Sequence, residues 1–317
     1  MITNDASGYV NRGKSKFEQG DIHGAISDYA EAIRLNPDFA KAYFHLGAAK
    51  DDLGDKQGAI SDYSEAIRLE PDDPYIYFFR GTVKCDLGDA EGAIADYDEA
   101  ILLSPELVTA YLCRGLAKNS LGNKLGLIDD FTEVIRLRPD DFAAYHRRGL
   151  AKSELGDYLG AIVDFAEASC LSGISKFNLG DKQGAIADYD KAIEFKPDFA
   201  YAYFNRGFAK EDLGDKLGSL NDYNEVIRLK PDFADSYYRR GFVKSDLGDK
   251  QGAICDYNEV IRLKPDFAYA YLLRGIAKDD LGDKSRITDV LRAAELFKMQ
   301  GDLESYNDSI KLIEQFQ

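Results

Sequence analysis

Glycine recurs in this chain at a fixed interval of 34 residues, and this interval constrains the fold more than any other feature of the sequence. Nine glycines share the spacing, in two series that are themselves separated by a shorter step: Gly13, Gly47, Gly81, Gly115 and Gly149, then Gly173, Gly207, Gly241 and Gly275. A period of this length indicates one small structural unit repeated along the chain. Because one such unit cannot bury its own apolar face, neighbouring units must stack.

Each repeat carries the signals of two helices joined by a tight turn. A second glycine follows seven residues after each of the first set, and Asp comes next in every repeat except at Asn123. An Asp in this place can cap the second helix by accepting bonds from its unsatisfied amides. Seven of the eight prolines end the second helix at one phase of the repeat: Pro37, Pro71, Pro105, Pro139, Pro197, Pro231 and Pro265.

Apolar residues within a repeat recur at helical spacing. In one second helix the stripe consists of Ala59, Ile60, Tyr63, Ala66, Ile67 and Leu69. Gly47 in the first helix and Ala59 in the second are small enough to let the two helices approach closely. The pattern predicts an all-α solenoid of antiparallel helix pairs.

The same residues resemble the tetratricopeptide repeat (TPR). Its pattern is matched by Tyr43, Leu46, Gly47, Ala59, Tyr63, Ala66 and Pro71, and nine repeats match across nearly the whole chain. The segments 205–207 (Asn-Arg-Gly) and 213–215 (Leu-Gly-Asp) look like the variant common in cyanobacterial repeat proteins. The resemblance implies a right-handed superhelical array that binds other proteins, and it names no ligand.

A charged pattern accompanies the glycines. Arg precedes the first glycine in most repeats, as at Arg12, Arg80, Arg114, Arg206 and Arg274, and Lys follows four residues later in all nine. Like charges four residues apart repel on a bare helix. The second helix offers an Asp before its aromatic residue, as at Asp28, Asp62, Asp96, Asp222 and Asp256. We therefore predict a repeated structural network of Arg and Lys with Asp between paired helices.

The interval from Gly149 to Gly173 is 24 residues instead of 34, and the missing stretch includes the turn that would end the fifth repeat. The apolar series Leu159, Ile162, Ala166, Cys170, Ile174 and Phe177 keeps helical spacing across the junction. One fused helix of roughly 21 residues is favoured over a kinked, shortened helix. We expect two sub-arrays, 6–165 (repeats 1–5, the fifth truncated) and 166–317 (repeats 6–9 and a capping helix), with a seam near 166–180.

The last segment has Leu303, Tyr306, Ile310 and Ile313 at helical spacing, with polar residues between them. A terminal repeat of a solenoid needs a polar outer face. We expect this segment to form a C-terminal capping helix.

Composition excludes several classes of function. The net charge of −16 disfavours nucleic acid as a partner, because binding to phosphates needs a basic surface. The sequence contains no run of about 18 apolar residues that would predict a membrane span, and the N-terminus does not resemble a signal peptide. A cytoplasmic location is therefore expected. Four dispersed cysteines without a CxxC pair are typical of reduced thiols.

Catalytic motifs are also unconvincing. Residues 8–15 satisfy the phosphate-loop pattern G-x-x-x-x-G-K-[ST], but no strand precedes Gly8 and the segment has the phase of a first helix. His23, His45 and His146 lie in different repeats without metal-ligand spacing. We predict a chain that is not an enzyme and needs no cofactor.

The resemblance assigns the concave wall of the array to the first helices, which are rich in aromatic residues here. Such rings suit a groove that binds an extended peptide or a partner helix. Acidic residues near the ends of the first helices would favour a neutral or basic protein partner. The candidate groove residues are Phe44, Tyr75, Phe78, Phe79, Tyr201, Phe204, Asn205, Phe208, Tyr238, Arg239, Phe242 and Tyr269.

Two functions remain open from the sequence. The first is a scaffold that binds a protein partner in the groove and supports assembly of a complex. The second is a structural protein that associates with itself through the truncated seam or the array ends, as a homodimer for example. The carboxylate clamp of some TPR proteins is matched at Asn205 and Arg239 but not at Cys170, Ile174 and Asp235, so it looks incomplete.

Overall fold

The computed structural model describes residues 5–316, and this range consists of helices joined by short turns, without strands. The chain divides into two compact parts, which meet between Asp164 and Phe165 and which we call the first and the second block. The helices of the first block are α1 (Ala6–Glu18), α2 (Ile22–Leu35), α3 (Ala40–Asp52), α4 (Lys56–Leu69), α5 (Pro74–Asp86), α6 (Ala90–Leu103), α7 (Val108–Ser120), α8 (Lys124–Leu137) and α9 (Phe142–Glu154). Helix α10 (Tyr158–Asn178) crosses the boundary. The second block continues with α11 (Lys182–Phe195), α12 (Ala200–Asp212), α13 (Lys216–Leu229), α14 (Ala234–Asp246), α15 (Lys250–Leu263), α16 (Ala268–Asp280), α17 (Arg286–Gln300) and α18 (Leu303–Phe316).

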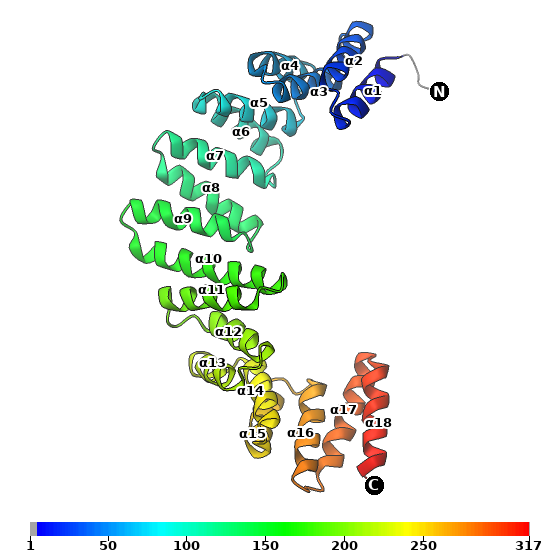
Figure 1. Ribbon diagram of the computed structural model, residues 1–317, viewed down its shortest axis with the longest axis vertical. Coiled ribbons are helices and arrows are strands. Elements are labelled where there is room, and N and C mark those ends of the chain that lie inside the picture. Colours follow the sequence, from blue (N-terminus) through cyan, green and yellow to red (C-terminus); the bar gives the residue numbers. More distant parts are fainter. Residues whose placement is uncertain (1–4, 317) are drawn as a thin grey trace. The chain divides into compact units, whose positions relative to one another are not determined.

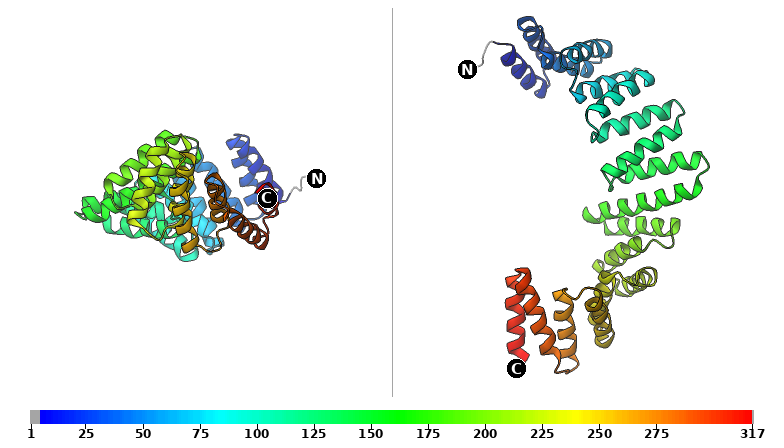
Figure 2. Two further views of the ribbon diagram at one scale, coloured as in Figure 1. Left: turned by 90° about the horizontal axis from the view of Figure 1, so that it is seen from below. Right: turned by 180° about the vertical axis from the view of Figure 1, so that it is seen from behind.

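Consecutive helices form antiparallel pairs in each block, as predicted. Helix α1 packs on α2, α3 on α4 and α5 on α6, and in the second block α12 packs on α13 and α14 on α15. Second helices within a block also pack on the first helix of the next repeat, for example α4 on α5 and α15 on α16. The stacked pairs can be followed in Figure 1 and, from behind, in Figure 2. The predicted all-α array of helix pairs is confirmed.

The turn within each repeat has the predicted chemistry. Gly20 has a φ of 83°, a left-handed conformation that side chains disfavour. Asp21 follows and accepts a hydrogen bond from the amide of Gly24 at 2.9 Å, which caps α2. Asn123 makes the same bond in the fourth repeat, to the amide of Gly126. The turn sequence therefore fixes where the second helix begins in the first eight repeats. In the last repeat α17 begins later, at Arg286, and Asp283 accepts a hydrogen bond from the amide of Ser285 instead.

The repeat glycine is required by the close approach of the paired helices. A Cβ atom at Gly47 would lie 3.1 Å from the ring of Tyr63 and 3.2 Å from the carbonyl oxygen of Ala59. Tyr63 is fully buried at that point, and Ala59 and Ala66 beside it are also buried. The small residues predicted at the contact are confirmed, and the aromatic ring fills the space that they leave.

The predicted network of basic and acidic residues is present between paired helices. In the third repeat the buried carboxylate of Asp96 forms ion pairs with Arg80 at 2.6 Å and with Lys84 at 2.8 Å. The same arrangement recurs at the other buried aspartates that face an Arg and a Lys: Asp28, Asp130, Asp164, Asp222, Asp256 and Asp289. Two cations per carboxylate satisfy a charge that burial would otherwise penalise.

The arginine also links neighbouring repeats, which the sequence pattern did not predict. The second nitrogen of Arg114 bonds Asp98 of the preceding repeat at 2.6 Å, and Arg206 bonds Asp190 in the same way. Arg240 and Arg274 reach asparagines at the equivalent position, Asn224 and Asn258. Each guanidinium thus joins two second helices, so the network runs along the array as well as within pairs.

The second repeat shows what the arginine contributes. Leu46 stands in its place, and within residues 5–316 the ion pair of Asp62 is with Lys50, at 2.6 Å. Burial raises the pKa of Asp62 despite that lysine. The pKa of Asp28, by contrast, is lowered, chiefly by its hydrogen bonds from Arg12. Desolvation is the largest influence on the pKa of Asp62, whereas the hydrogen bonds from the arginine are the largest influence on that of Asp28.

The fused helix predicted at the short interval is confirmed, since α10 runs for 21 residues from Tyr158 to Asn178. Gly173 lies inside it, where glycine weakens a helix by about 1 kcal/mol relative to Ala. The structure gives the reason for glycine: a Cβ there would lie 2.6 Å from the ring of Tyr189 and 3.1 Å from the carbonyl oxygen of Ala185. The close contact with α11 therefore requires glycine at position 173, although alanine would favour the helix.

The C-terminal segment forms the predicted additional helix. Gly301 ends α17 in a left-handed conformation with a φ of 78°, and α18 then packs on α17. Ile313 is buried, whereas Glu304 and Lys311 are exposed. The helix thus covers the last pair with its apolar side and presents polar residues outward.

Candidate partner-binding surface

The first helices of the repeats form a continuous row in each block. Helices α1, α3, α5 and α7 contact one another in sequence in the first block, and α14 contacts α16 in the second. Their outward residues therefore lie side by side across repeats. This row is the surface on which the predicted groove residues are placed.

In the second block the predicted rings divide into two groups. Tyr201, Phe242 and Tyr269, on α12, α14 and α16, are exposed. Phe204, Phe208 and Tyr238 are half-buried. Residues of the first group expose 42% to 49% of their surface to solvent, whereas those of the second group are more deeply packed.

The half-buried rings are held by packing between repeats. The ring of Phe204 lies 5.1 Å from that of Phe233 and 5.9 Å from that of Tyr223. Tyr238 lies 5.1 Å from Phe267, edge to face, and burial raises its pKa. Charged replacements at Phe204 or Tyr238 would disturb the fold as well as the surface.

A polar cluster crosses from α12 to α14. Arg239 lies 3.4 Å from Glu211, and its guanidinium stacks over the ring of Phe208 at 4.4 Å. Glu211 also accepts a hydrogen bond of 2.6 Å from the hydroxyl of Tyr223. The neighbouring Asn205 donates to the carbonyl of Tyr201 at 3.0 Å. Arg239 and Asn205, both predicted site residues, are thus engaged within the chain.

A hollow of about 300 Å³ lies between α14 and α16. Phe242, Leu273 and Ile276 supply apolar walls, and Tyr257 lies behind them on the second helix. One end is polar, where Lys250 contacts Ser245 at 3.1 Å and Asp280 at 2.7 Å. The shape and chemistry suit one large apolar side chain with a polar group beside it.

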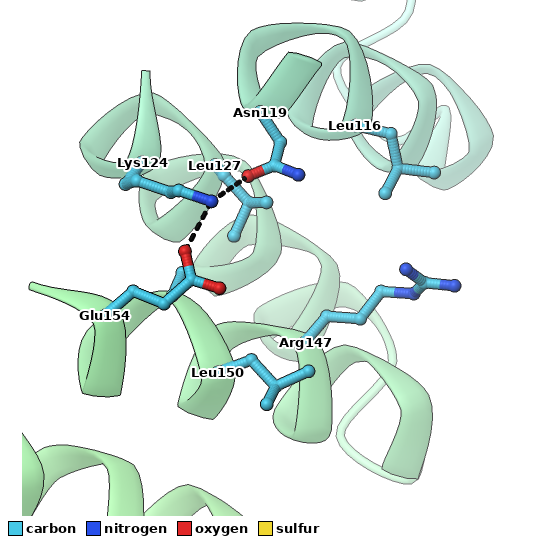
Figure 3. Close-up of a pocket in the computed structure, with 8 residues that line it drawn as sticks. Leu116, Asn119, Lys124, Leu127, Arg147, Leu150 and Glu154 are labelled. Atoms are coloured by element: carbon cyan, nitrogen blue, oxygen red, sulfur yellow. Dashed lines mark hydrogen bonds and ion pairs between the residues drawn. The ribbon is translucent and has the colours of Figure 1, made fainter. Parts of the chain in front are cut away.

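The first block has a smaller hollow, of about 90 Å³, at the equivalent place between α7 and α9. Leu116 and Leu150 follow the repeat glycine as Phe242 and Ile276 do, and Lys124 contacts Glu154 and Asn119 at the polar end (Figure 3). Arg147 stands where the second block has Leu273. The two hollows therefore share a position in the repeat but differ in charge.

The rings predicted in the first block gather on α3 and α5. Phe44 lies 5.5 Å from Phe79 and 5.8 Å from Tyr63, and Phe78 lies 5.9 Å from Tyr97. Tyr75 and Phe79 are exposed, whereas Phe44 and Phe78 are half-buried. The structure thus brings Phe44 and Phe79 together and leaves Tyr75 at the start of α5.

His45 lies among these rings, stacked on Tyr29 at 5.6 Å, and burial lowers its pKa to about 4. Because the unfolded chain binds a proton at higher pH than the folded chain, the free energy of unfolding should fall as the pH is lowered from about 6.5 toward 4. Through His45, the free energy of unfolding should be about 1–2 kcal/mol lower at pH 5 than at pH 7. Phe79 occupies the same repeat position, so His45→Phe should fit.

The measurement is urea unfolding of wild type and His45→Phe at pH 7 and pH 5. Other groups titrate in both proteins, so the quantity to compare is the change between the two pH values. We expect a smaller loss of stability in the variant. An equal loss in both proteins would contradict the assignment to His45.

The acidic ends of the first helices are largely paired. Eight acidic residues at these ends contact a basic side chain: Asp51, Asp86, Glu154, Glu211, Asp212, Asp246, Asp279 and Asp280. The partner is most often the first lysine of a second helix, such as Lys250 for Asp280. Their effect on a distant basic ligand is therefore weaker than the sequence suggested.

Sequence reasoning missed the aliphatic and polar residues of the two hollows. Leu273 and Ile276 complete the second hollow, and Leu116, Arg147 and Leu150 the first. A signal was available, because the residue after the repeat glycine is large and apolar in several repeats: Leu116, Leu150, Phe208, Phe242 and Ile276. Only the aromatic members of this set were selected.

Two alternative kinds of site can be judged from the geometry. The phosphate-loop match at residues 8–15 lies inside α1, where Gly13 is buried against Tyr29. Its amides are committed to the helix, so the segment cannot cradle a phosphate. Among residues 5–316, no helix is long and apolar enough to cross a membrane.

Comparisons with known proteins agree with this architecture. Family models described as TPR repeat match residues 13–54, 81–122 and 175–214, and models described as tetratricopeptide repeat match 40–73, 200–233 and 234–267. Together they cover more than half of the chain. No curated protein matches it.

Solved structures show the same fold. A crystal structure of MamA protein is 25% identical, with a TM-score of 0.51, and the match covers 55% of this chain and 94% of that one. A MamA fragment from Desulfovibrio magneticus RS-1 is 19% identical with a TM-score of 0.50, over 54% of this chain and 97% of that one. With its repeats matched by family models along both blocks, the chain belongs to the tetratricopeptide repeat family.

Proposed function

We propose that this protein is a non-catalytic scaffold that binds a segment of a partner protein along the first helices of the second block. The hollow between α14 and α16 is the observation that carries the proposal. A partner would place one large apolar side chain between Phe242 and Ile276, and its backbone would run past Tyr201 and Tyr269. Proteins of this repeat family are typically interaction scaffolds.

The chemistry of the hollow supports a peptide rather than a small charged metabolite. Phe242, Leu273 and Ile276 are its apolar walls, and its polar lining residues are Ser245, Asp246 and Lys250. Each of these polar residues already has a partner within the chain. Burying an apolar side chain there removes both surfaces from water at about 25 cal/mol per Å². The exposed rings beside it add contact area at low cost in side-chain entropy.

The charge of the chain bears on the partner. The net charge of −16 would repel an acidic protein at long range, even though the acids nearest the surface are paired. A neutral or basic segment is therefore proposed. The exposed row in the second block also includes Asp235, which pairs with Lys264 at 2.8 Å.

The test uses two variants with the same chemistry at the same repeat positions. Phe242→Asp with Ile276→Asp alters the hollow of the second block, and Leu116→Asp with Leu150→Asp alters the equivalent hollow of the first. All four side chains are exposed, so both variants should keep the helical circular dichroism signal and melting temperature. Each protein serves as bait in a lysate of the source organism, and bound proteins are identified by mass spectrometry.

We expect specific proteins to be lost from the second-block variant and retained by the first-block variant. Loss only from the first-block variant would place the binding surface on α7 and α9 and contradict the proposed site. Identical sets from wild type and both variants would contradict the groove as a binding surface altogether.

A further inference from the structure

The first half of α10 carries an apolar stripe that residues 5–316 leave partly exposed. Tyr158 is 66% exposed, Leu159 80%, Ile162 38% and Val163 45%. All four lie within two turns of one helix, so their side chains are neighbours on its surface. Exposed apolar clusters of this kind mark contacts with another molecule.

Comparison with the other repeats shows that two of these positions are normally covered. The counterparts of Ile162 are half-buried or buried, as at Ile60, Ile128 and Ile254. The counterparts of Tyr158 are mostly lysines that pair with the first helix of the next repeat, as Lys124 does with Glu154 on α9. In an ordinary repeat, therefore, the next first helix packs over this side of the second helix.

At the seam the covering helix is missing for a structural reason. The chain continues from the fifth repeat into the sixth within α10 itself, so no separate first helix follows to pack over Tyr158 and Ile162. The residues of α10 at these positions differ from those of the other repeats. Tyr158 replaces the lysine that the next helix would have paired, and Leu159 and Val163 extend the apolar surface beside it. The stripe is thus a surface on which another helix can pack.

Charge indicates what kind of molecule can bind to the stripe. Residues 158–163 include no charged side chain. The adjacent Asp164 is buried and paired with Arg148 at 2.6 Å and Lys152 at 2.9 Å, so it places no free charge on the stripe. A chain with a net charge of −16 repels a second copy over most of its surface, but this stripe is neutral and can meet its own copy.

We propose that the stripe is a self-association surface, on which α10 of one chain packs against α10 of a second copy about a two-fold axis. A two-fold contact places the same patch on both partners, and an uncharged apolar stripe on a helix is complementary to itself. Four side chains are fewer than the 20–30 residues per partner of a standard stable interface. The dimer is therefore weak and reversible, and it leaves the first-helix surface of the second block available.

The test is sedimentation equilibrium of the full chain over a wide range of concentration. The variant Tyr158→Lys with Leu159→Gln gives α10 the residues found at Lys56 and Gln57, which preserves the fold of the repeat. The control is Leu217→Gln on α13, which occupies the same repeat position as Leu159 and is 69% exposed. Circular dichroism checks that all three proteins have the same helix content.

We expect wild type and the control to show the same monomer–dimer equilibrium, and the α10 variant to have a dissociation constant at least tenfold higher. A wild-type chain that stays monomeric at every concentration would overturn the proposal. The partner of the stripe would then be a helix of another protein. Equal weakening by the control, or an unchanged constant in the α10 variant, would place any self-association elsewhere and overturn it as well.

Discussion

Replacing Asp222 by Asn is expected to lower the free energy of unfolding by about 3–5 kcal/mol. The carboxylate is almost fully buried, and it receives Arg206 at 2.5 and 3.0 Å and Lys210 at 2.9 Å. The neutral amide cannot balance these two cations, which are themselves mostly buried. Removing one member of a buried charged cluster costs far more than the cluster contributes as a whole, because the remaining charges lose their partner.

The matched control is Asp190→Asn, which changes another carboxylate bound to the same arginine. Asp190 contacts Arg206 at 2.6 Å, but its side chain is 55% exposed. Exposed pairs contribute less than about 1 kcal/mol, so this variant should stay close to wild type. Urea unfolding followed by circular dichroism measures both, and equal effects of the two variants would contradict the role assigned to burial.

Tyr223→Ala is expected to cost about 3–5 kcal/mol, because it leaves a cavity in the second block. The ring is completely buried and packs between Gly207 and Phe204, the latter with ring centres 5.9 Å apart. The repeat glycine exists to admit this ring, so no neighbouring side chain can expand to fill the space. The melting temperature and the urea midpoint should both fall.

Tyr223→Phe separates the ring from its hydroxyl group. Phe131 occupies the same repeat position, which shows that phenylalanine fits there. The lost hydrogen bond to Glu211, of 2.6 Å, joins a hydroxyl to a charged group and should cost about 1.5–3 kcal/mol. A loss as large as that of the alanine variant would show that the bond to Glu211, and not the buried ring, stabilises this part of the block.

Most of the repeat architecture could be predicted because its signals are local. The Asp after most turn glycines caps its own helix three residues on, as Asp21 does with Gly24, and needs no distant partner. The Arg, Lys and Asp network could also be predicted, since paired helices in a fixed repeat bring Arg206 and Asp222 together at a separation of 16 residues, which recurs in most repeats. The fused helix followed from apolar spacing alone.

The candidate surface was predicted less completely. Aromatic residues on the first helices were selected by type, but Phe204 and Tyr238 are held in ring contacts between repeats, and Leu273 and Ile276 were not selected. Side-chain exposure depends on which neighbours a helix has, and those neighbours come from other repeats. The pairing of Asp280 with Lys250, 30 residues earlier, was missed for the same reason.

The sequence by itself therefore determined the helices, the turns between them and the family, because each depends on residues a few positions apart or on the 34-residue period. Only the tertiary structure decided which side chains remain available to a partner. Ile162 has the same residue type and helical position as Ile60, yet it is exposed, because the helix that would cover it is joined to its own end. Exposure depends on the packing of whole helices, which a local pattern does not encode.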